Sequence, residues 1–195
     1  LIKEVSESAI VSDTLSLIYG STMQLTGKHI LITRPQPENQ LSCEVFHQWG
    51  AKALPLPMMR IDALTDNKAY IRSQIFDLDL YDKVIFISKN AVRHGIEWID
   101  DCWPMLPVGI TWIGIGKGTS TLLDDLGFDL GITAVSTDHS GQTSEDLLSQ
   151  SLMKDVEGQK ILIMGGEGGR TKLETTLVER GAMVNHLALY TRNKI

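Results

Sequence analysis

Three turns in the sequence each combine a positive charge with small or hydroxylated residues, directly after an apolar run. They contain Ser88, Lys89 and Asn90 in the first, Gly116, Lys117, Gly118 and Thr119 in the second, and Gly165, Gly166 and Arg170 in the third. Helical spacing follows each turn, so each would begin a helix. Unpaired backbone N–H groups at a helix N-terminus bind anions, and glycine lets an anion approach closely. The pattern therefore predicts a ligand with several anionic groups.

Simpler readings of the same residues compete with this prediction. Ser88 is also what an ordinary helix N-cap would be, Lys117 fits a solvated charge, and Tyr190 fits a sheet aromatic. The glycines at 114, 116 and 118 miss the dinucleotide-binding spacing, and the third turn lacks the ending of a P-loop. No Ser/His/Asp or Cys/His arrangement is evident. The residues thus indicate anion binding without an obvious acid, base or nucleophile.

Composition excludes several classes of function. The five histidines form no ligand cluster, and Cys43 and Cys102 are far apart, so we expect no metal and no cofactor. The cysteine usage fits a reducing compartment, and we expect a cytoplasmic protein. A net charge of -6 disfavours nucleic acid as a partner. No apolar run reaches the ~18 residues of a transmembrane helix, so we expect no membrane partner.

Strands and helices alternate along the chain. We expect strands over 29–33, 83–88, 111–116, 131–136, 160–165 and 183–190, and helices over 38–49, 89–99, 118–126, 143–153 and 170–180. The later strands are nearly continuous in Ile, Val and Leu, which is typical of a parallel sheet covered on both faces. The pattern predicts an α/β, flavodoxin-like doubly wound domain. Its strands would place the three turns at one edge, where such sheets bind ligands.

A series of motifs also resembles one known family. The motifs are HILITRP, YDKVIFISKNAV, IGIGKGTSTLLDDLG, TSEDLL, KILIMGGEGGRTKLETTLVERGA and LALYTR, in this order. Together, over about residues 29–192, they resemble uroporphyrinogen-III synthase. The resemblance implies cyclisation of hydroxymethylbilane, a linear tetrapyrrole with eight carboxylates, to uroporphyrinogen III. Water is lost, the terminal pyrrole ring is inverted, and no cofactor is needed.

Site residues follow from the matched motifs. By resemblance, Tyr190 would assist departure of the hydroxyl, and Thr119, Arg34, Ser88 and Arg170 would line the substrate cleft. Thr119, which begins the helix after IGIGKG, is the second candidate catalytic hydroxyl. The strand-end turns themselves supply the other expected substrate-binding residues, which are Lys89, Asn90, Gly116, Lys117, Gly118 and Gly166.

The resemblance also implies two α/β domains joined by a two-stranded linker. We expect an N-terminal extension or leader over 1–22 and the start of the first domain over 23–56, with the rest of that domain absent. A linker over 57–66, a complete second domain over 67–188 and a return linker strand over 189–195 would follow. We expect a monomer at full length, or a dimer or domain swap if the chain is truncated.

Two alternatives remain open from the sequence. One is a flavodoxin-like nucleotide- or anion-binding module without this chemistry, which bound flavin absorbance would reveal. The other is a receiver-like sensor, which would require an acidic cluster at the strand ends that the sequence lacks.

Overall fold

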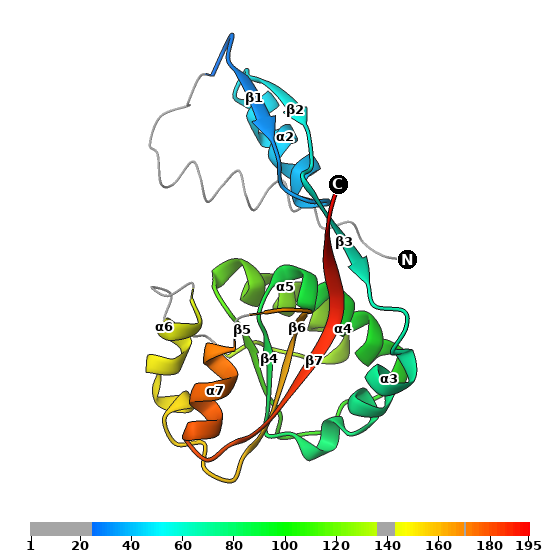
Figure 1. Ribbon diagram of the computed structural model, residues 1–195, viewed down its shortest axis with the longest axis vertical. Helices are drawn as coiled ribbons and strands as arrows, with labels where there is room; N and C mark the ends of the chain where they lie inside the picture. The colour runs from blue at the N-terminus through cyan, green and yellow to red at the C-terminus, as the bar shows by residue number, and fades with distance from the viewer. Residues whose placement is uncertain (1–24, 136–142, 170) are drawn as a thin grey trace. The chain divides into compact units, whose positions relative to one another are not determined.

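The computed structural model describes residues 25–135, 143–169 and 171–195 (Figure 1). The chain divides into two compact units, of which the larger is Asp62–Thr191. The smaller contains the described residues before Asp62 together with Arg192–Ile195. The expected extension over 1–22 lies outside the described residues.

The smaller unit is built on a parallel strand pair joined by a helix. Strand β1 (His29–Ile32) pairs with β2 (Lys52–Pro55), and α2 (Glu38–Gln48) makes the crossover. Alternating side chains divide between the two faces of the pair. Ile32, Ala53 and Cys43 form a small core, whereas Leu31 and its register partner Leu54 are 55% and 45% exposed. One face of this pair is thus covered by α2.

A five-stranded sheet has the order β3-β7-β6-β4-β5, and its strands β4, β5 and β6 lie wholly in the larger unit. The strands are β3 (Met59–Ala63), β4 (Lys83–Phe86), β5 (Thr111–Gly114), β6 (Lys160–Gly166) and β7 (Met183–Lys194). The neighbours β7, β6, β4 and β5 are parallel. The α/β fold with a mostly parallel sheet, predicted from the sequence, is confirmed.

One expected strand is wrong in extent. Within 131–136, the described residues make only an isolated bridge between Ala134 and Trp112. The chain enters this segment from a 3-10 turn, η2 (Phe128–Leu130), and reverses at Gly131 with a φ of 76°. The turn at Gly131 sets the direction in which the chain leaves, and the described residues that follow meet β5 only through this bridge. Residue 136 lies outside the described residues.

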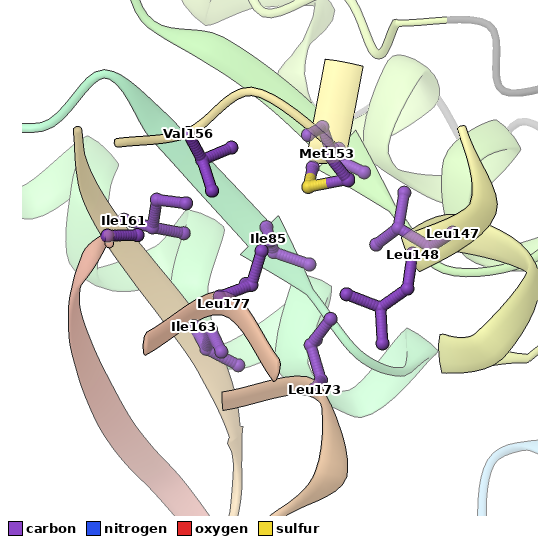
Figure 2. Packing of buried hydrophobic residues seen from close by; sticks show 11 residues of the cluster. Ile85, Leu147, Leu148, Met153, Val156, Ile161, Ile163, Leu173 and Leu177 are labelled. Carbon is purple, nitrogen blue, oxygen red and sulfur yellow. The ribbon is translucent and has the colours of Figure 1, made fainter. Parts of the chain in front are cut away.

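Helices cover both faces of the larger sheet. One face carries α6 (Ser144–Ser149), η3 (Ser151–Met153) and α7 (Lys172–Glu179), so the helix expected over 143–153 is interrupted where Gln150 is extended. Figure 2 shows Ile85 and Ile163 of the sheet packed with Leu173 and Leu177 of α7. This apolar layer is the main core of the unit.

The opposite face carries α3 (Lys68–Phe76), followed by the 3-10 turn η1 (Leu78–Leu80), and then α4 (Lys89–Cys102) and α5 (Lys117–Gly127). A Cβ on Gly95 of α4 would lie 2.7 Å from Phe86 Cε1 and 2.9 Å from Met164 Sδ. Only glycine allows the helix to approach the sheet this closely, because carbon atoms normally stay ~3.5 Å or more apart.

The strand order places a switch point between β4 and β6. The chain runs from β4 to β5 on one side, and then returns to β6 and β7 on the other side of β4. In doubly wound sheets, ligands bind outside the carboxyl ends of the strands at such a point. A ligand site is therefore expected at the turns after β4 and β6.

Candidate functional site

The turn after β4 begins α4 with a side-chain cap. Ser88 is extended, and its Oγ accepts a hydrogen bond from the Ala91 backbone N–H at 3.1 Å. Lys89 and Asn90 follow in the first helical turn, both half-buried. Asn90 Oδ1 accepts a hydrogen bond from Arg93 at 3.3 Å. The N-cap interpretation of Ser88 is thus correct, and the same hydroxyl also contacts Tyr190.

The turn after β5 lies directly beside the first one. A Cβ on Gly118 would be 3.1 Å from Lys89 Cε, so the lysine side chain rests against this glycine. Gly116 precedes α5 with a φ of 81°, and no side chain caps the helix. Lys117 and Gly118 are exposed, whereas Thr119 is only 7% exposed. The structure therefore brings one lysine between two adjacent helix N-termini, a suitable arrangement for an anion.

The turn after β6 is joined to the first turn through Tyr190. A Cβ on Gly166 would lie 2.5 Å from Tyr190 Cε2, so glycine is required for the ring to pack there. Tyr190 is fully buried, and its Oη lies 2.9 Å from Ser88 Oγ. The His94 ring is tilted against it with centroids 5.8 Å apart. Tyr190, expected to present its phenol to a ligand, thus has no exposed surface and reaches the strand ends through Ser88.

Two predicted site residues are not among the described residues of the larger unit. Arg170 lies outside the described residues. Arg34 belongs to the smaller unit, where it is exposed and its Nη1 donates to Ser42 Oγ at 3.3 Å. The fully buried Asn39 donates from Nδ2 to the backbone oxygens of Ile32 at 2.8 Å and Arg34 at 2.9 Å. Asn39 thereby fixes the turn that carries Arg34.

The sequence reasoning missed Asn39 and His94. Asn39 had a detectable signal, since it precedes the apolar face of an expected helix and follows a Pro-rich turn, where an amide side chain often satisfies backbone groups. His94 had none, because its contact with Tyr190 joins two elements far apart in the sequence. Among the residues the structure describes, no three potential ligands cluster to hold a metal ion.

A separate cavity of about 300 Å³ lies at the amino ends of β6 and β7. It is lined by Gln74, Asp77, Leu80, Tyr81, Lys160, Met183 and Asn185. Burial raises the pKa of Tyr81, and the hydrogen bond from Asn185 at 2.7 Å opposes that shift. Burial likewise lowers the pKa of Lys83, the first residue of β4. These shifted groups are at the opposite strand ends from the three turns.

No described helix has both the length and the apolar character needed to cross a membrane. The fold and the strand-end turns together define a doubly wound α/β protein with a site suited to an anionic ligand. A family model described as Uroporphyrinogen-III synthase HemD matches residues 41–195.

Curated relatives agree with this match. The chain is 32% identical over 165 residues to a uroporphyrinogen-III synthase of Proteus mirabilis, covering 84% of this chain and 79% of that protein. It is 28% identical to the Salmonella typhimurium enzyme and 26% identical to that of Escherichia coli, in each case over 84% of this chain and 64% of the relative. The chain belongs to the uroporphyrinogen-III synthase family, as the motifs predicted.

Solved structures share the fold. A mutant uroporphyrinogen III synthase from the extremely thermophilic bacterium Thermus thermophilus superposes with a TM-score of 0.59 at 15% identity, over 87% of this chain and 64% of that one. The uroporphyrinogen-III synthetase of Helicobacter pylori gives a TM-score of 0.51 at 14% identity, over 86% and 62%. The chain thus spans less than two thirds of the length of these structures.

Proposed function

We propose that this protein cyclises hydroxymethylbilane to uroporphyrinogen III, with loss of water and inversion of the terminal pyrrole ring. The observation that carries the proposal is membership of the family, through the match over residues 41–195 and the named relatives. The strand-end turns support it, because a substrate with eight carboxylates needs several anion-binding groups. Lys89 and Lys117 flank two adjacent helix N-termini at this edge.

The reaction requires more positioning than acid–base chemistry from the protein. The pyrrole nitrogen of the substrate helps expel the hydroxyl and leaves an electrophilic azafulvene. Attack at the substituted position of the terminal ring gives a spiro intermediate, which fragments and recloses with that ring inverted. Binding of the carboxylates by Lys89, Lys117 and the helix N-termini would hold the chain in the folded conformation that this attack needs. A charged hydrogen bond of this kind contributes roughly 1.5–3 kcal/mol.

Hydroxyl groups would assist departure of the leaving group. Thr119 and Tyr190 are the candidates, supported by Tyr190's contact with Ser88 at the switch point and by Thr119's place in the first turn of α5. We also propose Arg34, Asn90, Gly116, Gly118, Gly166 and Arg170 as substrate-binding positions. Their support is the turn chemistry and the motif matches.

Organisation and compartment form part of the same proposal. We propose that 67–188 is one complete α/β domain, which 57–66 and 189–195 link to the domain begun by 23–56. The adjacency of β3 and β7 in one sheet supports this division. The free cysteines Cys43 and Cys102 support a reducing, cytoplasmic setting. We propose a monomer at full length, which light scattering of the purified protein distinguishes from a dimer or swapped dimer.

The decisive experiment incubates the purified protein with enzymatically generated hydroxymethylbilane and separates the type I and type III isomers. We expect type III to predominate, because the protein must prevent direct closure of the unfolded substrate to type I. A product ratio equal to that of a protein-free control would refute the proposed function. Repeating the assay after exhaustive chelation tests the expected independence from metal, which loss of activity restored by a metal would contradict.

A further inference from the structure

The pair formed by Ser88 and Tyr190 bears on how the hydroxyl of the substrate leaves. Tyr190 is fully buried, with its ring against Gly166 and His94, whereas Ser88 is half-buried at the carboxyl end of β4. The two hydroxyl oxygens are 2.9 Å apart. A ligand at this end of the sheet therefore meets Ser88, and Tyr190 lies behind it.

The hydrogen bonds of Ser88 determine which way its own proton points. Its Oγ has two lone pairs, and the Ala91 N–H occupies one of them at 3.1 Å. Either hydroxyl can donate in the contact between Ser88 and Tyr190. A phenol is a stronger acid than an aliphatic alcohol, which favours Tyr190 as the donor into the second lone pair of Ser88. With both lone pairs occupied, the only hydrogen bond left to Ser88 is the one it donates. That proton has no partner within the pair and is available to an acceptor at the strand ends.

We infer that Ser88 is the catalytic hydroxyl that protonates the leaving group, and that Tyr190 is a positioning residue acting through it. The inference rests on the proposed function. As the C–O bond breaks, its electron pair stays with oxygen, which takes the Ser88 proton and leaves as water. The pyrrole nitrogen supplies an electron pair to the carbon, and the Tyr190 proton moves onto Ser88 Oγ. Ring closure later releases one proton from the tetrapyrrole, which returns through Ser88 to Tyr190.

A double-mutant cycle in the isomer assay tests this order of action. If Tyr190 acts only through Ser88, removing it adds no loss once Ser88 is gone, whereas independent residues give losses that multiply. We expect Tyr190→Phe to lower kcat about tenfold and Ser88→Ala about tenfold to a hundredfold, the low range of acid catalysis. The double variant should match Ser88→Ala within about twofold. The KM should change little, because the proton is transferred only as the bond breaks.

Loss of the helix cap must be separated from loss of the donor. Thr143→Ala is the matched control, because Thr143 caps α6 in the same unit with its own side chain. This variant should lose a helix cap and melt at a temperature lowered about as much as that of Ser88→Ala. Its kcat should stay at the wild-type value. Ser88→Thr retains cap and hydroxyl, and should recover kcat to within about threefold of wild type. Failure of this rescue together with a normal melting temperature would overturn the role of Ser88.

The outcomes separate the two proposals. In one outcome the wild-type protein is active and the kcat loss of the double variant equals the product of the two single losses. That result overturns the action of Tyr190 through Ser88, while the proposed function stands. A wild-type protein that makes no excess of type III overturns the proposed function, and this inference with it. Non-additive kcat losses with unchanged KM and rescue by Ser88→Thr support both.

Discussion

Replacing Gly166 by alanine tests the packing that holds Tyr190 behind Ser88. The new methyl would lie 2.5 Å from Tyr190 Cε2, 2.8 Å from Cζ and 3.0 Å from Cδ2. Carbon atoms pack at about 3.5–4.0 Å, so the ring must move by about 1 Å. Tyr190 is fully buried, and a movement of that size would break its 2.9 Å contact with Ser88.

Two opposing effects set how much unfolding free energy Gly166→Ala loses. Overpacking of this kind costs about 1–3 kcal/mol. Gly166 has no left-handed φ, so alanine is tolerated by the backbone and offsets about 0.5–1 kcal/mol of that cost. The net loss of unfolding free energy is therefore about 0–2.5 kcal/mol. For a chain of this size, the midpoint of about 1 kcal/mol lowers the melting temperature by about 2–4 °C.

The assay combines thermal unfolding with turnover. Gly169→Ala is the matched control, because its methyl would meet only ordinary contacts at 3.7 Å and its φ is also not left-handed. We expect Gly169→Ala to melt like wild type, and Gly166→Ala to melt lower and to lose about as much kcat as Tyr190→Phe. Identical melting temperatures and turnover for both glycine variants would show that the ring has room to move, and would refute the reasoning.

Three further predictions concern other parts of the larger unit. Thr119→Val keeps the shape of a nearly buried side chain and should lower turnover about tenfold if its hydroxyl assists water loss; unchanged turnover would leave it a packing role. Lys89→Gln should raise KM about tenfold with a smaller change in kcat, whereas the exposed Lys154→Gln should change neither. Burial lowers the pKa of Lys83, although the negative charge of Asp82 acts to raise it. Just below the ordinary lysine pKa of 10.5, the unfolded chain therefore binds more protons than the folded one. The free energy of unfolding should therefore rise with pH through that window, and Lys83→Met should flatten the rise in denaturant titrations.

The sequence by itself determined the fold class and the family. Nearly continuous apolar strands, such as the Val84, Ile85 and Phe86 run of β4, require cover on both faces. Helices with one apolar side supply that cover, so a parallel doubly wound sheet follows from the local pattern. The turns that would bind anions were also readable, because glycine, a hydroxyl and a cation at a strand end are a local signature.

Only the tertiary structure decided what those turns contact. The sequence predicted a strand over 131–136, yet among its described residues only Ala134 pairs with Trp112, since pairing depends on where the turn at Gly131 directs the chain. Likewise, nothing local shows that Tyr190 is buried against Gly166 and bonded to Ser88, 102 residues earlier in the chain. Side-chain type and spacing predict which groups are available, whereas burial and hydrogen-bond partners depend on strand order, which brings β4, β6 and β7 side by side.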